Sequence, residues 1–97
     1  MLVTATGSAG LLIPQNAVRK SLLIQNTDGT NAVYVKRESA SSISVSASNF
    51  DFKIGPGGAV AINSLIDGLK AIQDSYTVIS AAGSPVMAVF ETEDIGR

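Results

Sequence analysis

The sequence predicts an all-β fold, a single antiparallel β-sandwich or jelly-roll-like barrel of about seven or eight short strands. Short apolar runs alternate with polar residues at the period of a strand, and turn residues separate these runs about every 8–12 positions. Hydrophobic residues make up 45% of the chain and charged residues 15%, which is too apolar for a disordered chain. A length of 97 residues suits one domain, so we expect residues 1–97 to fold together.

The segment RKSLLIQNTDGTNAVYVKRE, residues 19–38, contains two strand patterns on either side of Asp28-Gly29. Each run alternates between two faces, and Leu23 and Tyr34 lie opposite the other apolar residues of their runs. Asp-Gly is a strong turn signal, because glycine accepts a positive φ and aspartate tolerates it. The pattern therefore predicts a β-hairpin.

Three further strands and a turn are expected in the middle of the chain. The Ser/Ala-rich segment 38–49 has the composition of a flexible linker, but the alternation around Ile43–Val45 favours a short edge strand. FDFKI (50–54) and AVAIN (59–63) read as strands, and GPGG (55–58) between them reads as a turn.

The segment SLIDGLKAIQDS, residues 64–75, is the only one with the apolar spacing of a helix. Gly68 in its middle disfavours a helix by about 1 kcal/mol relative to alanine. We therefore prefer an irregular connection with a short strand near residues 69–72.

The last third of the chain predicts a second hairpin, formed by SYTVISA (75–81) and VMAVFE (86–91) across the segment AAGSP. We expect Val86, Ala88 and Phe90 to face one side of the second strand, and Met87 and Val89 to face the other. Residues 1–16 are expected to form an N-terminal arm, and residues 92–97 a C-terminal tail.

Composition excludes several classes of function. The chain has no cysteine and no histidine, so it lacks thiolate ligands and the commonest general base. Its net charge of -1 gives no general attraction to nucleic acid or to an anionic membrane. We expect neither a signal peptide nor a membrane span, because the N-terminal sequence has no basic region and no apolar run is long enough.

Each candidate for chemistry has a simpler structural explanation. GPGG is followed by a strand instead of the helix that a phosphate loop needs. Ser21 and Ser80 have no histidine with which to form a catalytic triad. Three candidates remain. Glu91, Glu93 and Asp94 could form a carboxylate cluster, and Asp67 and Asp74 could form an acid–base pair. A basic patch could be formed by Arg19, Lys20, Lys36 and Arg37. We interpret these as a solvated tail, turn residues and a solvated strand edge, and we expect no enzyme activity, no metal and no cofactor.

Apolar residues occur on both faces of several predicted strands, although only one face of each sheet in a small sandwich is internal. The surplus predicts that another chain covers part of the surface, although scattered exposed apolar residues are also normal in a monomer. The residues predicted to make such contacts are Leu11, Leu12, Ile13, Leu23, Tyr34, Met87, Val89 and Ile95. Segments 11–13 and 89–95 would become ordered on docking.

Three motifs follow one another along the chain. They are an early Arg-x-x-Leu-x-Ile-x-Asn strand at Arg19–Asn26, a middle Pro-Gly turn at Pro56–Gly58 and a late Tyr-Thr-x-Ile-x-Ala strand at Tyr76–Ala81. In this order they resemble the small β-rich virion proteins of tailed bacteriophages. The resemblance covers residues 17–92. Where the family commonly has Gly after Val-Tyr-Val, this chain has Lys36-Arg37.

The resemblance implies a capsid decoration (cement) protein, located on the capsid surface of the virion, that stabilises the head by protein–protein contacts. Its implied partners are the major capsid protein and further copies of the chain, with a trimer favoured, and it has no catalytic residues. A phage tail or fibre-attachment module that binds a receptor or glycan is the alternative, although exposed aromatic residues are few. A small hydrolase is a third class, which the lack of histidine and cysteine disfavours.

Overall fold

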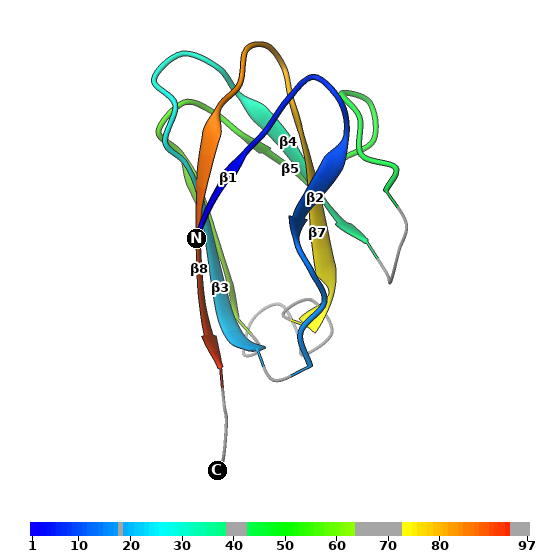
Figure 1. Ribbon diagram of the computed structural model, residues 1–97, viewed down its shortest axis with the longest axis vertical. Helices are drawn as coiled ribbons and strands as arrows, with labels where there is room; N and C mark the ends of the chain where they lie inside the picture. Colours follow the sequence, from blue (N-terminus) through cyan, green and yellow to red (C-terminus); the bar gives the residue numbers. More distant parts are fainter. Residues whose placement is uncertain (18, 39–42, 64–72, 94–97) are drawn as a thin grey trace.

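The structure, a computed structural model, describes residues 1–17, 19–38, 43–63 and 73–93. These residues form eight strands in two antiparallel sheets, which confirms the predicted all-β sandwich. The strands are β1 Leu2–Thr4, β2 Gly10–Ile13, β3 Arg19–Asn26, β4 Val33–Glu38, β5 Phe52–Ile54, β6 Ala59–Asn63, β7 Ser75–Ser80 and β8 Val86–Glu93. Figure 1 shows the two layers, with β1, β8 and β3 in one and β2, β7 and β4 in the other.

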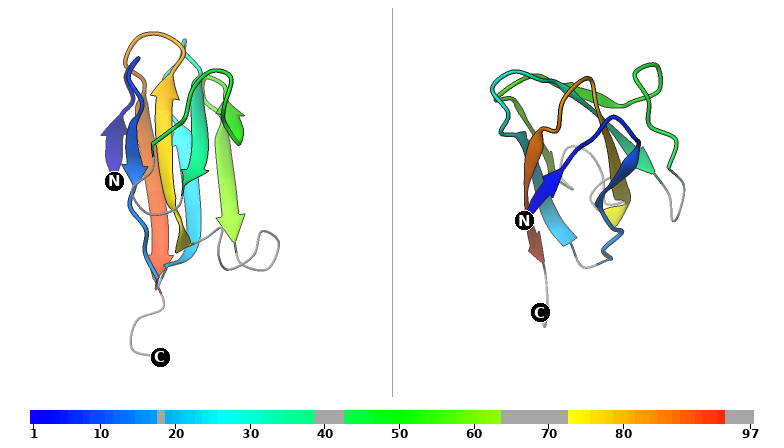
Figure 2. Two further views of the ribbon diagram at one scale, coloured as in Figure 1. Left: turned by 90° about the vertical axis from the view of Figure 1, so that its right-hand side faces the viewer. Right: turned by 45° about the horizontal axis from the view of Figure 1, so that its top comes forward.

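The strand pairing is that of a jelly roll. Sheet A has the order β1-β8-β3-β6 and sheet B the order β2-β7-β4-β5 (Figure 2). The pairs β1–β8, β2–β7, β3–β6 and β4–β5 are those of one long hairpin. Folding that hairpin over on itself brings β3 beside β8 and β4 beside β7, which completes both sheets of the sandwich.

The predicted hairpin over residues 19–38 is wrong, because β3 belongs to sheet A and β4 to sheet B. The turn at Asp28 does form, and its Oδ2 atom accepts hydrogen bonds from the N–H groups of Thr30 (2.9 Å) and Asn31 (2.6 Å). This turn lies within a longer connection that crosses between the sheets. The second predicted hairpin is wrong for the same reason, since β7 lies in sheet B and β8 in sheet A.

The predicted turn at residues 55–58 is present and also joins the two sheets. The Gly58 N–H donates to the Gly55 carbonyl at 2.9 Å, and Gly57 has a φ of +75°. A proline at the second position of a turn, followed by a residue with positive φ at the third, is typical of a type II turn. The strands expected on either side of this turn are β5 and β6.

The inner faces of the two sheets form the core. Ile24 and Met87 of sheet A and Val33 and Val35 of sheet B are fully buried there. Four residues expected to contact a partner, namely Leu12, Ile13, Met87 and Val89, also lie in this core, which corrects the expectation that they are surplus. The inner faces hold them because the N-terminal residues add a strand to each sheet, so the core is larger than the predicted arm allowed.

Residues 1–16 are therefore not an arm, because β1 pairs with β8 and β2 pairs with β7. At the other end of the chain, β8 continues through Glu93 and so includes the start of the predicted tail. The edge strand expected at Ile43–Val45 does not form, and only an isolated bridge joins Ser46 to Asn49. The predictions for residues 64–72 and 94–97 lie outside the described residues.

Arg19 closes the end of the sandwich at which β3 begins. Its side chain is buried, and its Nε donates to Glu91 Oε1 at 2.8 Å. Nη1 donates to the Asp74 carbonyl at 3.0 Å, and Nη2 donates to the Pro14 carbonyl. These bonds join β3 and β8 of sheet A to the segments beside β7 and β2 of sheet B, and they satisfy a charge that would be costly to bury alone.

Asn26 performs a similar role at the opposite end. Its Nδ2 donates to the Asn31 carbonyl at 2.8 Å and to the Ile54 carbonyl at 3.2 Å. Its Oδ1 accepts a hydrogen bond from the Asp28 N–H at 3.1 Å. One fully buried side chain thus fixes the crossing connection after β3 to the end of β5.

This end of the molecule generates a stability prediction. Gly83 has a φ of +66°, and a Cβ placed there would lie 2.6 Å from Asn31 Nδ2. We expect Gly83→Ala to lower the free energy of unfolding by about 1–2 kcal/mol, because alanine is strained in the left-handed region. Urea unfolding would measure the loss.

Two other glycines provide matched controls for this variant. Gly57→Ala has the same kind of φ strain with open space around the new Cβ, and Gly7→Ala has open space and no positive φ. The expected order of destabilisation is Gly83, then Gly57, then Gly7. Equal stability of Gly83→Ala and Gly7→Ala would contradict this account of the turn.

Candidate functional site: the outer face of sheet A

The outer face of sheet A carries exposed apolar side chains that lie directly opposite one another on neighbouring strands. Leu23 of β3 lies opposite both Phe90 of β8 and Ala61 of β6, so these three form one row. Ala88 lies between Leu2 and Gln25 in the next row. Directly opposed residues of antiparallel strands share a face, so the rows define a continuous surface. We call this surface the A face, formed by Leu2, Thr4, Ser21, Leu23, Gln25, Ala59, Ala61, Val86, Ala88, Phe90 and Thr92.

None of the side chains that define the A face is charged. Its large apolar members are open to solvent, with exposed fractions of 71% for Leu2, 57% for Phe90 and 37% for Leu23. The charged residues of the same strands, including Lys20 and Glu93, gather at the end of the sheet where β3 begins and β8 ends. A contiguous apolar surface without charge is typical of a site that another molecule covers.

The size of the A face can be bounded from strand geometry. Four strands span about 19 Å and eight residues of β3 extend about 27 Å, which gives at most about 500 Å². This area includes the polar side chains of Thr4, Ser21, Gln25 and Thr92, so the apolar part is smaller than the bound. The largest apolar patch of a typical soluble monomer covers roughly 300–600 Å² and is often functional. It is smaller than the roughly 800 Å² that each partner contributes to a standard interface.

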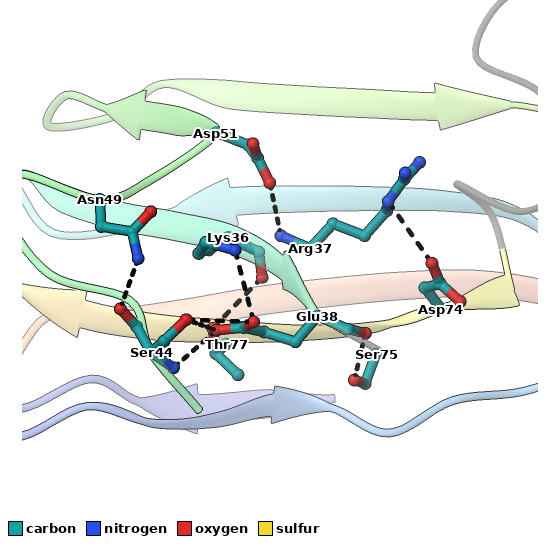
Figure 3. Close-up of polar contacts among 9 residues, drawn as sticks. All are labelled: Lys36, Arg37, Glu38, Ser44, Asn49, Asp51, Asp74, Ser75 and Thr77. Carbon is teal, nitrogen blue, oxygen red and sulfur yellow. Dashed lines mark hydrogen bonds and ion pairs between the residues drawn. The ribbon is translucent and has the colours of Figure 1, made fainter. Parts of the chain in front are cut away.

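The outer face of sheet B is different, because the chain itself covers part of it with charged and polar contacts (Figure 3). The Ser44 N–H donates to Glu38 Oε2 at 2.7 Å, and Asn49 Nδ2 donates to the Ser44 carbonyl at 3.0 Å. Val45, between these two residues, is buried although it does not belong to the main core cluster. Residues 44–49 thus pack on sheet B, whereas no described segment covers the A face in this way.

Among the carboxylates of the described residues, only Asp74 is more deeply buried than Glu38. Burial alone would raise the pKa of Glu38, but hydrogen bonds from the Ser44 N–H and hydroxyl and the charge of Lys36 together hold this pKa below its ordinary value. The Lys36 Nζ lies 3.4 Å from Glu38 Oε1, and Thr77 Oγ1 donates to Oε2 at 3.4 Å. A carboxylate held ionised by so many donors stabilises the covering segment and is a poor general base.

The other candidates for chemistry have structural partners. Glu91 is paired with Arg19, and Glu93 accepts a hydrogen bond from Asn16 Nδ2 at 2.6 Å. Asp74 Oδ2 lies 3.4 Å from Arg37 Nε, while Asp67 and Asp94 lie outside the described residues. Within the described ranges, no three His, Cys, Asp or Glu side chains gather in a way that could hold a metal ion.

The four cationic residues of segment 19–38, considered as a candidate basic patch and interpreted as a solvated strand edge, do not lie on one surface. Arg19 is buried with a carboxylate partner in sheet A, whereas Lys36 and Arg37 lie on β4 in sheet B. These residues were grouped because the two strands were assigned to one hairpin. Their separation into different sheets removes the reason for the grouping.

Of the eight predicted contact residues, the structure leaves two well exposed, Leu23 on the A face and Leu11 on β2. Tyr34 is half-buried beside the Phe50 ring, with the two ring centroids 4.8 Å apart, and Ile95 lies outside the described residues. The predicted contact residues did not include Leu2 or Phe90, which are more exposed than Leu23, although Phe90 lies within the predicted contact segment 89–95. The VMAVFE run is apolar at both alternating sets of positions, so its pattern alone does not indicate which set faces outward.

The chain matches no protein-family model, no curated protein and no solved structure with which it was compared. The described residues include no helix with the length and hydropathy of a membrane span. The case for a function therefore depends on the geometry of the two faces and on the sequence motifs.

Glu38 generates a prediction about pH. Because its pKa in the folded protein is lowered from an ordinary value of 4.5, its charge contributes stability at pH values above 4.5, and this contribution is lost as the pH falls through the folded-state pKa. We expect the free-energy difference between the wild type and Glu38→Gln to be constant near neutral pH and to shrink below about pH 4.5. Urea unfolding of both proteins from pH 7 to pH 3 would measure it. Parallel curves over the whole range would contradict the proposed role of Glu38.

Proposed function

We propose that this protein is a structural component of a tailed-phage particle, most simply a decoration protein that attaches to the head through the A face. The single observation that supports an attachment role is the exposed row of Leu23, Phe90 and Ala61, which belongs to a surface without charge. Removing such a surface from water is favourable in free energy, and docking would not have to desolvate any charged side chain on it.

Two further features support a particle component. The sandwich has jelly-roll pairing, an architecture that viral capsid domains share with lectins and cupins, although fold alone does not determine function. The motifs at Arg19–Asn26 and Tyr76–Ala81 resemble those of small phage virion proteins, and in the structure they form β3 and most of β7. The major capsid protein is the proposed partner, and the predicted trimer remains a prediction.

The energetics suit a component that is present in many copies. Fully burying one large apolar side chain contributes about 1.5–3 kcal/mol, and the A face offers Leu2, Leu23, Val86 and Phe90. Association costs roughly 4–15 kcal/mol because the two molecules lose translational and rotational freedom, and this cost offsets much of the gain from burial. A single A face therefore supports modest affinity, and neighbouring copies on a shell would strengthen attachment.

The alternative, a tail or fibre module that binds a receptor, is favoured by one feature of the opposite side. Phe50 is 38% exposed and packs against Tyr34, and Lys53 Nζ lies 5.7 Å from the centre of the Tyr34 ring. An exposed aromatic side chain beside a cation can contact a sugar ring. Binding to a glycan array that is lost in Phe50→Ala would favour this alternative over head decoration.

The proposed function predicts the effect of charge on the A face. Phe90→Lys should weaken binding to purified head shells of the encoding phage more than tenfold, because a lysine ammonium would be desolvated at the contact. Co-sedimentation of the protein with shells at increasing concentration would measure the change. The same shells should melt at a higher temperature with the wild-type protein than without it.

Ile43→Lys provides the matched control, since Ile43 is 50% exposed and lies in the segment that follows β4, away from the A face. This variant should bind shells like the wild type. Equal binding of Phe90→Lys and the wild type would contradict attachment through the A face, and a wild type that does not bind shells would contradict head decoration.

A further inference from the structure

The free edge of β6 is the least protected sheet edge among the described strands. Strands β1 and β5 are three residues long, and β5 carries Lys53, whereas β2 has an irregular register and is followed by Pro14. Strand β6 has five residues, AVAIN, with a regular register against β3 and neither a charge nor a proline. Short length, lysine, proline and bulges are the usual protections of an edge, and β6 has none of the last three.

The hydrogen-bond pattern shows which main-chain groups of β6 are available. The Asn26 N–H donates to the Gly58 carbonyl at 2.9 Å, so position 58 is bonded to β3. Bonded positions alternate along an antiparallel pair, so residues 60 and 62 also point their main-chain groups toward β3. Ala59, Ala61 and Asn63 therefore point theirs toward the free edge, where the described part of the chain supplies no partner strand.

We propose that two copies of this chain pair through β6, antiparallel and about a two-fold axis that passes beside Ala61. This register aligns all five residues, because Ala61 then lies opposite Ala61 of the second copy and Ala59 lies opposite Asn63. Those are the positions whose N–H and C=O groups point outward, so the pairing can form about six hydrogen bonds. Ala59 and Ala61 are exposed along the join, and β6 brings no charged residue to it.

A second copy is the occupant that best fits this edge, because the pairing also completes the A face. A two-fold axis perpendicular to the sheet places the two A faces side by side in one continuous sheet of twice the strand number. Their combined area has an upper bound of about 1,000 Å², whereas the bound for one A face is below the roughly 800 Å² that a standard interface needs from one partner. This inference builds on the proposed function, since it supplies the area that one A face lacks.

Cysteine cross-linking tests the pairing and its register, since the natural chain has no cysteine. In the proposed dimer the two copies of Ala61 lie about 5.5 Å apart, whereas the two copies of Ala59 are displaced by four residues, or about 14 Å. We expect a short bismaleimide to cross-link Ala61→Cys at least tenfold faster than Ala59→Cys. The mass of the wild type in sedimentation should rise with concentration from 10.0 kDa toward twice that value.

Equal cross-linking rates for the two variants, a mass that stays at 10.0 kDa at all concentrations, or the trimer that the family resemblance implies would each overturn the pairing. The shell-binding experiment is separate, because it can succeed with a monomeric protein. Phe90→Lys distinguishes the two ideas further, since Phe90 lies on β8, two strands from the edge, and this variant should lose shell binding while still forming the β6 pair.

Discussion

The contact between the two apolar inner faces, where Ile24, Val35 and Met87 are fully buried, determines which side chains are left on the outer faces. Side chains alternate across a strand, so every residue committed to the core leaves its neighbours on an outer face. In sheet B the chain covers part of that outer face with the segment held by Glu38. In sheet A the corresponding large apolar side chains, Leu2, Leu23, Val86 and Phe90, are left exposed.

The sequence predicted the local elements better than their arrangement. The strands at Arg19–Asn26, Val33–Glu38 and Ala59–Asn63 and the turn at 55–58 were predicted because alternation and glycine preferences act over a few residues. The two hairpins were wrong because Asp28-Gly29 indicates a change of direction without specifying whether the chain returns to the same sheet. Buried polar groups such as Asn26, which anchors the connection after β3, determine that choice, and no short motif identifies them.

The candidate site was predicted only in part, for a related reason. An apolar surplus on outer faces was expected, and Leu23 belongs to it, but Met87 and Val89 are in the core and Phe90 is exposed in their place. Both alternating sets of the VMAVFE run are apolar, so only the pairing of β8 with β3 decides which set faces inward. The coherent row across β6, β3 and β8 brings together residues from distant parts of the sequence and is visible only once the sheet order is known.

The two sides of the sandwich thus differ in the way that attachment would require, with a covered, charged side and an uncharged, open side. A cryo-electron microscopy map of head shells incubated with the protein would test this central claim most directly. The account predicts density for the protein with Leu23 and Phe90 turned toward the shell and the segment held by Glu38 turned toward solvent. The opposite orientation, with the outer face of sheet B against the shell, would contradict it.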